Sequence, residues 1–533
     1  MKRTKNPAKE AEYRKRAADL VAQMTLHEKV SQMLSWAPAI ERLGIPAYNW
    51  WSEGIHGVGR AGTATVFPQA IGMAAAFDED MMEQVGNAVG VEARGKYNMC
   101  RAHGDRDIFK GLTVWAPNIN IFRDPRWGRG HETYGEDPFL TSRLGVRFVE
   151  GMQGDDPDYL QAAACAKHFA GYSETQGGRD ASEADLSHRK LESWFLPPFE
   201  RVAKEGCGTF MLGYESIEGV PVTFNKWLLT DKLRGAWQYN GTLITDWDNV
   251  GRSVWEQHVK PDYVHAAADA VKAGNDLVMT TPQFYEGAIE AVKTGLLDES
   301  LIDDAVARIL ALKFRLGLFE DPRLPDAERI KAVIGSAEHQ QTNLELARES
   351  VALLRNDGAL PFAANKAKRI AVVGPLADDA QNQLGDWTGN SGQVSWMPDG
   401  QPRGMITTVL DGLTQLTSDD CEVVYSRGAN VIDLVPDPAG EFYPDGQPRP
   451  KIGVSAAVDR AMIDEAVANA RQSDLIVAVV GDVVQLVGET CSTATLELLG
   501  GQNALLDALA AVSRETGKPM VTVLISSKPQ VLP

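Results

Sequence analysis

Residues 239–248 read Tyr-Asn-Gly-Thr-Leu-Ile-Thr-Asp-Trp-Asp, a short apolar run that is entered through a turn and ends in carboxylates and an indole. Leu243 and Ile244 are typical of the buried half of a strand, so Asp246 and Trp247 follow where that strand emerges. A carboxylate in this place is often only a helix N-cap. Trp247 favours another hypothesis, because an aromatic face beside a carboxylate suits a sugar ring and its reacting carbon.

The same alternation of strand and helix recurs on both sides of this stretch. Further strands are predicted near residues 112–117, 161–167, 208–214 and 275–280, and helices near 12–34, 78–97, 138–152, 189–204, 261–273, 283–294 and 299–316. Alternating strands and helices form a parallel sheet, and six or more such units over about 300 residues favour a closed β/α barrel. The chemistry of such a barrel lies at the carboxyl ends of its strands, which is where Asp246 is expected.

A second, smaller alternation begins near residue 369. Its strands are predicted at 369–374, 421–425, 475–480 and 520–525, its helices at 455–471 and 501–514, and the proline-rich stretch 430–453 is expected to be a surface excursion. Strands and helices in this order predict a separate α/β sheet domain.

We therefore predict an α/β protein with two domains. Residues 1–322 form a TIM-type (β/α)8-like barrel, 323–365 a linker with a connecting helix, and 366–533 an α/β sandwich. The chain length of 533 residues is also too great for one core. Because Pro533 follows directly after a strand, we expect the sandwich to be incomplete at its C-terminus.

Composition restricts the classes of partner. With 53 basic and 72 acidic residues the net charge is −19, so neither nucleic acid nor an anionic membrane is an expected partner. No run approaches the roughly 18 apolar residues that span a bilayer, and the N-terminus lacks the apolar segment of a signal peptide. We expect a cytoplasmic protein or, alternatively, a periplasmic or secreted one whose signal has been removed. The five cysteines have neither zinc-site nor disulfide spacing.

The polar residues near the predicted strand ends are acids, cations and aromatics. Glu53 lies in a tryptophan-rich loop, Arg129 in a loop with three arginines, Lys167 and His168 follow one strand, and Tyr214 follows another. Each has an ordinary structural interpretation, such as a surface ion pair, a helix cap or a core tyrosine. Together they suit a neutral polyhydroxylated ligand. The sequence contains no HExxH, GxSxG or Walker motif and no GxGxxG after a strand, so neither metal nor cofactor is predicted.

Several stretches resemble glycoside hydrolase family 3, the β-glucosidase and β-xylosidase family. They include WWSEGIHGV (50–58), RDPRWGRGHETYGEDP (123–138), KHFAGY (167–172), ITDWD (244–248) and ESVALLRNDGALPF (349–362), in family order. The combination of KHF with TDW is more specific than either motif alone. The resemblance implies a barrel followed by an α/β sandwich, with both contributing to one active site.

The resemblance also implies roles for individual residues. Asp246 takes the position of the catalytic nucleophile, and Trp247 would flank the leaving-group subsite. The acid/base comes from a loop of the second domain, where Glu489 matches best and Asp482 and Glu497 remain alternatives. The positions that hold the non-reducing sugar are matched by Glu53, Arg129, Lys167, His168 and Tyr214.

The implied activity is that of a retaining, exo-acting β-glycosidase, which releases β-D-glucose from cello-oligosaccharides or from aryl and alkyl β-glucosides. WWSEGIHGV and RDPRWGRGHETYGEDP resemble the xylosidase branch, whereas TDW and residues 177–180 resemble the glucosidase branch. We prefer β-glucosidase, with β-xylosidase as the alternative. The N-acetylglucosaminidases of the family are disfavoured, because Ala170-Gly171-Tyr172 stands where they carry Pro-Gly-His.

A hypothesis from a different class is a catalytically silent sugar-binding relative, since binding and catalysis share most of these residues. The presence of both Asp246 and Glu489 argues against it. The expected partners are small oligosaccharide or glycoside substrates and a second copy of the chain in a homodimer.

Overall fold

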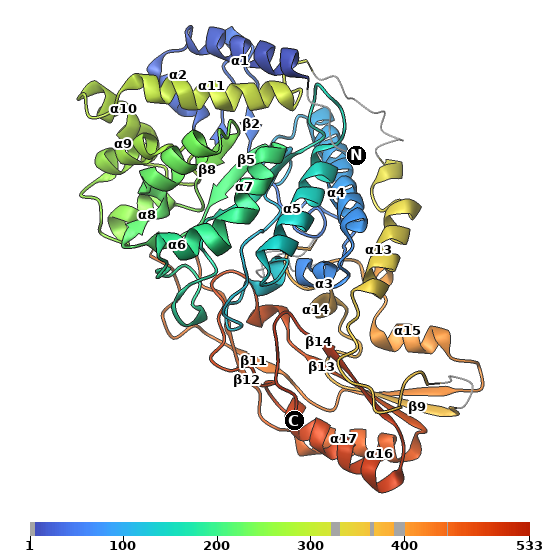
Figure 1. Ribbon diagram of the computed structural model, residues 1–533. Coiled ribbons are helices and arrows are strands. Elements are labelled where there is room, and N and C mark those ends of the chain that lie inside the picture. Colours follow the sequence, from blue (N-terminus) through green and yellow to red (C-terminus); the bar gives the residue numbers. More distant parts are fainter. Residues whose placement is uncertain (1–5, 321–330, 363–366, 389–399, 445) are drawn as a thin grey trace. The chain divides into compact units, whose positions relative to one another are not determined.

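The structure is a computed structural model that describes residues 6–320, 331–362, 367–388, 400–444 and 446–533 (Figure 1). The chain divides into two compact units. The first contains Met1–Asp124 and Glu132–Ser350, and the second contains Pro125–His131 and Val351–Pro533. The predicted linker 323–365 lies partly outside the described residues. Its described helix, α13 (Ala337–Glu349), belongs to the first unit.

Parallel strands form the centre of the first unit. Four of them pair side by side in the order β3 (Thr113–Val114), β4 (Ala163–Phe169), β5 (Thr209–Leu212) and β8 (Thr242–Ile244). Single parallel bridges continue the ring at both sides, joining Ser52 to Val114, Ile244 to Leu277, and Leu34 to Val278. The ring closes through β1 (Trp36–Ala37) and β2 (Tyr48–Asn49), which are antiparallel. The predicted barrel is therefore confirmed, but the antiparallel pair was not predicted, and residues 275–280 contribute bridges rather than a full strand.

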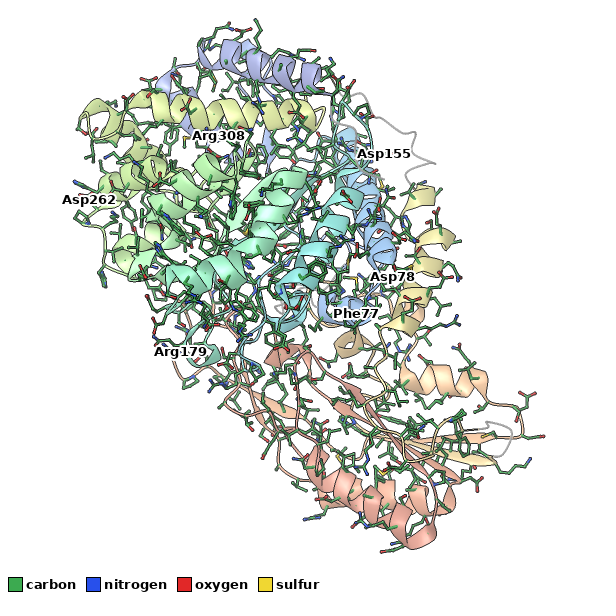
Figure 2. All side chains as sticks on the ribbon, viewed as in Figure 1. Phe77, Asp78, Asp155, Arg179, Asp262 and Arg308 are labelled. Carbon is green, nitrogen blue, oxygen red and sulfur yellow. The ribbon has the colours of Figure 1, made fainter. Side chains whose placement is uncertain are left out.

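Helices cover the outside of this ring, and Figure 1 shows α1 beside α11 and α4 beside α5. The main ones are α1 (Pro7–Val21), α2 (Leu26–Gln32), α4 (Glu79–Ala102), α5 (Pro138–Gln153), α7 (Leu196–Glu205), α8 (Asn249–Trp255), α9 (Tyr263–Ala273), α10 (Phe284–Lys293) and α11 (Glu299–Arg315). Aspartates fix several helix starts. Asp78 accepts from the backbone N–H of Met81, and Asp262 from that of His265 (Figure 2).

A buried carboxylate anchors the strand that leads to Asp246. Asp276 is fully buried and accepts hydrogen bonds from the backbone N–H of Leu243 (2.8 Å), Nη2 of Arg234 (2.6 Å) and Nε of Arg308 (2.8 Å; Arg308 is labelled in Figure 2). Two guanidiniums and an amide compensate the cost of removing this charge from water. The start of β8 is thereby fixed in the barrel.

The second unit contains a parallel sheet in the order β10 (Glu422–Ser426), β9 (Arg369–Val373), β13 (Leu475–Gly481) and β14 (Met520–Ile525). Alternate residues of β9 enter different apolar clusters. Ala371 and Val373 pack with α16 (Arg460–Gln472) and α17 (Gln502–Thr516), whereas Ile370 and Val372 pack with residues of α15 (Val409–Leu416). Both faces of the sheet are therefore covered, and the predicted α/β domain is confirmed.

The segment 430–453, which was predicted to be a surface excursion, includes regular strand structure. It contains β11 (Ile432–Val435) and leads into β12 (Ile452–Ser455), and the two form an antiparallel hairpin. The residues that flank the proline-rich connection pair across it as the two strands of this hairpin. In the part of the chain that the structure describes, no helix is both long and apolar enough to cross a membrane.

Candidate active site

Asp246 follows β8 directly and is 6% exposed. Its Oδ1 accepts a hydrogen bond from the backbone N–H of Trp247 (2.7 Å), and its Oδ2 lies 3.9 Å from Nε2 of His168. His168 lies in β4, so the ends of two barrel strands meet at this pair. This arrangement agrees with the expectation that strand ends carry the functional groups.

Asn120 orients His168, and it was not predicted as a site residue. Its Oδ1 accepts from the backbone N–H of His168 (2.9 Å) and lies 3.0 Å from Nδ1 of the ring, while its Nδ2 donates to the backbone carbonyl of His168 (2.8 Å). The acceptor at Nδ1 favours the tautomer that carries its proton there. The sequence signal that could have identified Asn120 is its position shortly after the predicted strand 112–117.

Glu53 and Lys167 lie in the same unit and are both almost fully buried. Oε1 of Glu53 accepts from Nε1 of Trp51 (2.7 Å), and Oε2 lies 3.9 Å from Nζ of Lys167. No residue that the structure describes donates a hydrogen bond to this Oε2. A buried carboxylate oxygen near an ammonium is suited to accept a hydrogen bond from a ligand hydroxyl.

Three tryptophans form an aromatic cluster next to these polar groups. The ring of Trp51 stacks on that of Trp115 with centroids 4.7 Å apart and meets Trp247 edge to face at 5.2 Å. Trp51 also donates to Glu53, so the cluster connects the predicted sugar-binding acid with the residue beside Asp246. Such rings offer apolar faces to the C–H surfaces of a sugar or aglycone.

Tyr214 follows β5 and is partly exposed. Its ring lies 6.0 Å from that of Tyr172, which in turn lies 4.9 Å from the imidazole of His168. The guanidinium of Arg252 lies over the Tyr214 ring at 5.2 Å. The first unit thus brings Glu53, Lys167, His168, Tyr214, Asp246 and Trp247 toward one end of its barrel.

Glu215, next to Tyr214, was not predicted. It is fully buried, and neither carboxyl oxygen has a hydrogen-bond partner among the described residues. Burial raises the pKa of this carboxyl well above its usual value, and the charge of Asp246 raises it further. Burial and the nearby charge of Asp246 thus both favour the protonated form of Glu215.

Asp248 is the nearest alternative nucleophile in the sequence, and its oxygens serve the fold. Oδ1 accepts from the hydroxyl of Thr281 (2.7 Å), and Oδ2 accepts from Nε1 of Trp255 (2.9 Å). The first bond connects the start of α8 with the loop before α10, and the second connects it with the last residue of α8. The geometry favours Asp246 over Asp248.

In the second unit, Nη1 of Arg129 lies 3.6 Å from Oε1 of Glu489. The Arg129 side chain is 2% exposed and that of Glu489 is 26% exposed. The two alternative acids differ from Glu489. Asp482 is buried against Nζ of Lys528 (3.3 Å), and burial raises its pKa, whereas Glu497 is exposed. A partly exposed carboxylate beside a buried guanidinium is the best of the three for contact with a ligand.

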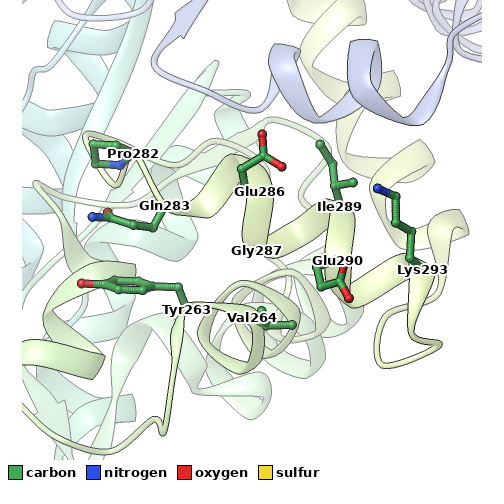
Figure 3. Close-up of a pocket in the computed structure, with 9 residues that line it drawn as sticks. All are labelled: Tyr263, Val264, Pro282, Gln283, Glu286, Gly287, Ile289, Glu290 and Lys293. Carbon is green, nitrogen blue, oxygen red and sulfur yellow. The ribbon is translucent and has the colours of Figure 1, made fainter.

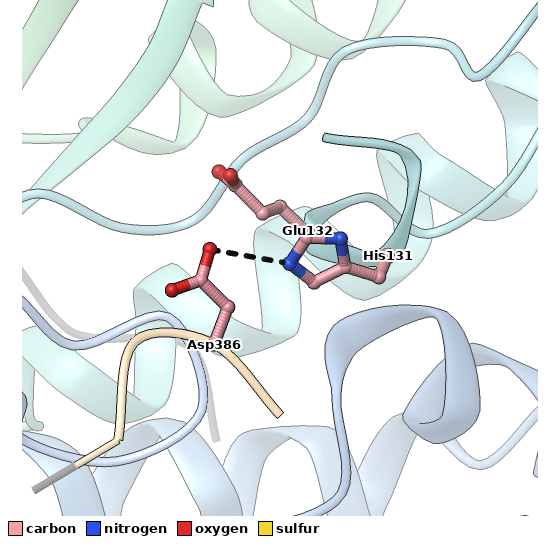
Figure 4. A group of neighbouring side chains, drawn as sticks. All are labelled: His131, Glu132 and Asp386. Atoms are coloured by element: carbon pink, nitrogen blue, oxygen red, sulfur yellow. Dashed lines mark ion pairs between the residues drawn. The ribbon is translucent and has the colours of Figure 1, made fainter. Parts of the chain in front are cut away.

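His131 and Asp386 form a second buried pair in the second unit, with Nε2 of His131 3.7 Å from Oδ2 of Asp386 (Figure 4). Both side chains are of the kinds that bind transition metals. The absence of a metal from the reaction therefore stays a prediction.

The groove drawn in Figure 3 lies elsewhere. It has a volume of about 560 Å³ and is lined by residues of α9, α10 and the loop before α10, including Tyr263, Gln283 and Glu290. None of the predicted site residues lines it. We do not assign the sugar site to this groove.

Both parts of the chain match models of known protein families. Residues 16–312 match the model of the "Glycosyl hydrolase family 3 N terminal domain", and residues 351–533 match that of the "Glycosyl hydrolase family 3 C-terminal domain". The chain is 33% identical to a "Beta-xylosidase" of Formosa agariphila over 97% of its own length and 67% of that protein. It is 32% identical to a "Periplasmic beta-glucosidase" of Salmonella typhimurium over 95% of its length and 62% of that protein.

One solved structure is much more similar in sequence. It is described as "a beta-Glucosidase Involved in Saponin Metabolism from Intestinal Bacteria" and shares 73% identity, with a TM-score of 0.88. The match covers 97% of this chain and 71% of that one. The chain spans about two thirds of the length of the curated relatives named above.

Proposed function

The chain belongs to glycoside hydrolase family 3, and from that premise we propose that it is a retaining, exo-acting β-glucosidase. The observation that carries the proposal is the position of Asp246, which ends β8 with Oδ2 3.9 Å from the oriented imidazole of His168. Substrates are cello-oligosaccharides and aryl or alkyl β-glucosides.

In the first step, an ionised Asp246 attacks the anomeric carbon. A bond forms between the carboxylate oxygen and this carbon while the glycosidic C–O bond breaks, and Glu489 gives its proton to the departing oxygen. The product is a covalent glycosyl-enzyme. Inversion at the anomeric carbon accompanies this displacement.

In the second step, Glu489 acts as the base. It takes a proton from a water molecule whose oxygen attacks the anomeric carbon, and the bond to Asp246 breaks. This second inversion restores the β configuration. Glu489 has regained its proton and Asp246 its charge, so the enzyme returns to its starting state.

The remaining polar residues bind the sugar. Oε2 of Glu53 accepts from one hydroxyl, and Lys167 and His168 donate to others, as does Arg129. Each of these four side chains is at least nine-tenths buried, so an unfilled hydrogen bond to a wrong sugar is costly. Trp247 covers the aglycone side.

The β-xylosidase alternative has its own support in the Formosa agariphila relative, whereas the 73% identical structure supports β-glucosidase. Xylose differs from glucose by lacking the hydroxymethyl group on C5. The test is a side-by-side measurement of kcat/KM on nitrophenyl β-glucoside and nitrophenyl β-xyloside. We expect kcat/KM to be higher on the glucoside. A higher kcat/KM on the xyloside would instead identify the enzyme as a β-xylosidase.

Release of nitrophenol from neither compound would favour the silent sugar-binding relative. Because the similar β-glucosidase is named for saponin metabolism, a saponin β-glucoside belongs in the same panel. Its hydrolysis would extend the aglycone range to large apolar groups.

A further inference from the structure

The loop that carries Glu489 is paired with a segment from a distant part of the sequence. Residues 125–131 belong to the second unit although the chain on both sides of them belongs to the first. Within this segment Trp127 forms an antiparallel bridge with Ser492. The backbone carbonyl of Arg126 accepts from the N–H of Thr493 (3.1 Å), so the two stretches form a short ribbon.

Backbone hydrogen bonds of this ribbon involve residues both before and after Glu489 in the sequence. The carbonyl of Gly128 accepts from the N–H of Gly488 at 2.7 Å, directly before Glu489. The N–H of Cys491 donates to the carbonyl of Gly488 at 3.2 Å and closes a four-residue turn with Glu489 at its second position. Thr490, the third residue of that turn, has a φ of +64°, where glycine is usual. External contacts must therefore hold this turn.

Gly128 permits this close approach. A Cβ atom at Gly128 would lie 1.9 Å from the carbonyl oxygen of Cys491 and 2.6 Å from that of Gly488. Both obstacles are backbone atoms, so a change of rotamer cannot relieve the clash. The φ of Gly128 is outside the left-handed region. The absence of a side chain, rather than an unusual dihedral angle, is what the pairing requires.

The neighbouring side chains anchor the segment. Trp127 is completely buried and Arg129 is 1% exposed, and Arg129 is also the residue whose guanidinium lies 3.6 Å from the Glu489 carboxylate. A shift of the ribbon by about 1 Å would therefore move the carboxylate and its cation relative to each other. Misplacement of this size in a catalytic group commonly costs about 100-fold in rate.

We propose that Gly128 is a positioning residue for the acid/base Glu489, because its bare backbone is the surface on which the loop 488–493 is fixed. This inference rests on the proposed function. It assigns to the RWGR stretch a task beyond the sugar contact of Arg129. Proton transfer at the leaving oxygen depends on it, whereas attack by Asp246 does not.

The test compares Gly128→Ala with Glu489→Ala on two β-glycosides of the preferred sugar. A disaccharide or alkyl glycoside needs a proton on its leaving oxygen, and a dinitrophenyl glycoside hardly does. We expect Gly128→Ala to lower kcat/KM at least tenfold more for the first substrate than for the second. Added azide should raise its turnover of the dinitrophenyl glycoside and yield the β-glycosyl azide.

Gly404→Ala is the matched control, since a Cβ at Gly404 meets no atom within 4 Å and its φ is not positive. It should retain wild-type rates on both substrates. Equal losses on both substrates for Gly128→Ala, or wild-type rates on both, would overturn the role of Gly128 while leaving Glu489→Ala to report on the acid/base. If Glu489→Ala itself lacks the leaving-group dependence, the acid/base assignment fails and this inference fails with it.

A measurement on the unaltered protein covers the case in which Gly128→Ala does not fold. Hydrogen exchange should show the amides of Gly488 and Thr493 protected, because their acceptors are the carbonyls of Gly128 and Arg126. Protection of both supports the ribbon. Exchange of both amides at the rate of an unstructured peptide would overturn the proposal.

Discussion

Nε2 of His168 lies 3.9 Å from Oδ2 of Asp246, while Nδ1 of the same ring lies 3.0 Å from Oδ1 of Asn120. The same Asn120 oxygen accepts from the backbone N–H of His168, so the ring is fixed relative to its own strand. A carboxylate at the end of β8 is therefore held next to an imidazole whose orientation is set before a substrate arrives. Such preorganisation is the main way in which a protein stabilises a transition state.

Replacement of Asp246 by asparagine should abolish turnover. The amide has nearly the same shape but cannot form the glycosyl ester, so kcat should fall by about three or more orders of magnitude while the melting temperature stays near that of the wild type. Steady-state rates on nitrophenyl glycosides and thermal unfolding measure both effects.

Asp248→Asn is the comparison variant for Asp246→Asn. Because Asp248 accepts from Thr281 and Trp255, we expect a loss of stability of about 1 to 2 kcal/mol and a smaller effect on kcat. Near wild-type kcat in Asp246→Asn together with an inactive Asp248→Asn would move the nucleophile to Asp248.

Glu489→Ala should show the signature of a missing acid/base. Cellobiose hydrolysis should fall by orders of magnitude, whereas formation of the glycosyl-enzyme from dinitrophenyl glucoside should persist, and azide should accelerate turnover to give β-glucosyl azide. The exposed Glu497→Ala provides the control and should leave both rates unchanged. Equal losses on both substrates without azide rescue would transfer the test to Asp482.

Lys313 should make stability depend on pH. Its side chain is fully buried, and its two acceptors among the described residues are both neutral: Oε1 of Gln32 (2.7 Å) and the carbonyl of Pro46 (3.1 Å). Burial lowers the pKa of Lys313 to about 7. Between pH 7 and about 10.4 the unfolded chain thus binds more protons than the folded one, and stability rises with pH over this window.

Lys313→Met should remove that dependence. From pH 7 to pH 10, the unfolding free energy of the wild type should rise relative to that of the variant by up to about 4 kcal/mol. Urea unfolding at several pH values measures this shift. A difference that stays constant across the window would contradict a neutral buried lysine.

Glu215 should have the opposite effect, so that its contribution to stability falls as the pH rises. Burial and the charges of Asp246 and Asp180 raise the pKa of its carboxyl well above the usual value. The contribution of this protonated carboxyl to the free energy of unfolding is therefore fully present below about pH 4.3, and it is lost as the pH rises through the pKa of the folded state. Glu215→Gln has a similar shape and no proton to lose. Its melting temperature should exceed that of the wild type by an amount that grows from pH 4 to pH 8, and an amount that does not grow would contradict a protonated Glu215.

Local patterns in the sequence predicted the parallel strands β4, β5 and β8 and the polar residues that follow them, because apolar periodicity and strand ends are local properties. The antiparallel pair β1 and β2 was missed, since each strand has only two residues. The association of residues 125–131 with the second unit depends on contacts to residues 488–493. Periodicity within either stretch carries no information on such a pairing.

The site residues divide in the same way. Asp246, Glu489 and the residues predicted to bind the sugar were inferred from motif resemblance, and the structure describes where each of them lies. Asn120 and Glu215 were missed because their burial and their neighbours depend on residues that are distant in the sequence. A single asparagine or glutamate beside an apolar run does not reveal such an environment. Burial also distinguishes Glu489 from Asp482 and Glu497.

The central claim is that Asp246 forms a covalent glycosyl-enzyme, and trapping that species tests it most directly. A dinitrophenyl 2-deoxy-2-fluoro-β-glucoside forms the intermediate through its good leaving group, while the fluorine slows the breakdown of the intermediate by destabilising the oxocarbenium-like transition state. After protease digestion, mass spectrometry should find the fluoroglucosyl group on the peptide that contains Asp246, and on the Asp246 carboxylate within it. A label on Asp248 or another carboxylate, or no label on an enzyme that hydrolyses the parent glucoside, would contradict the account.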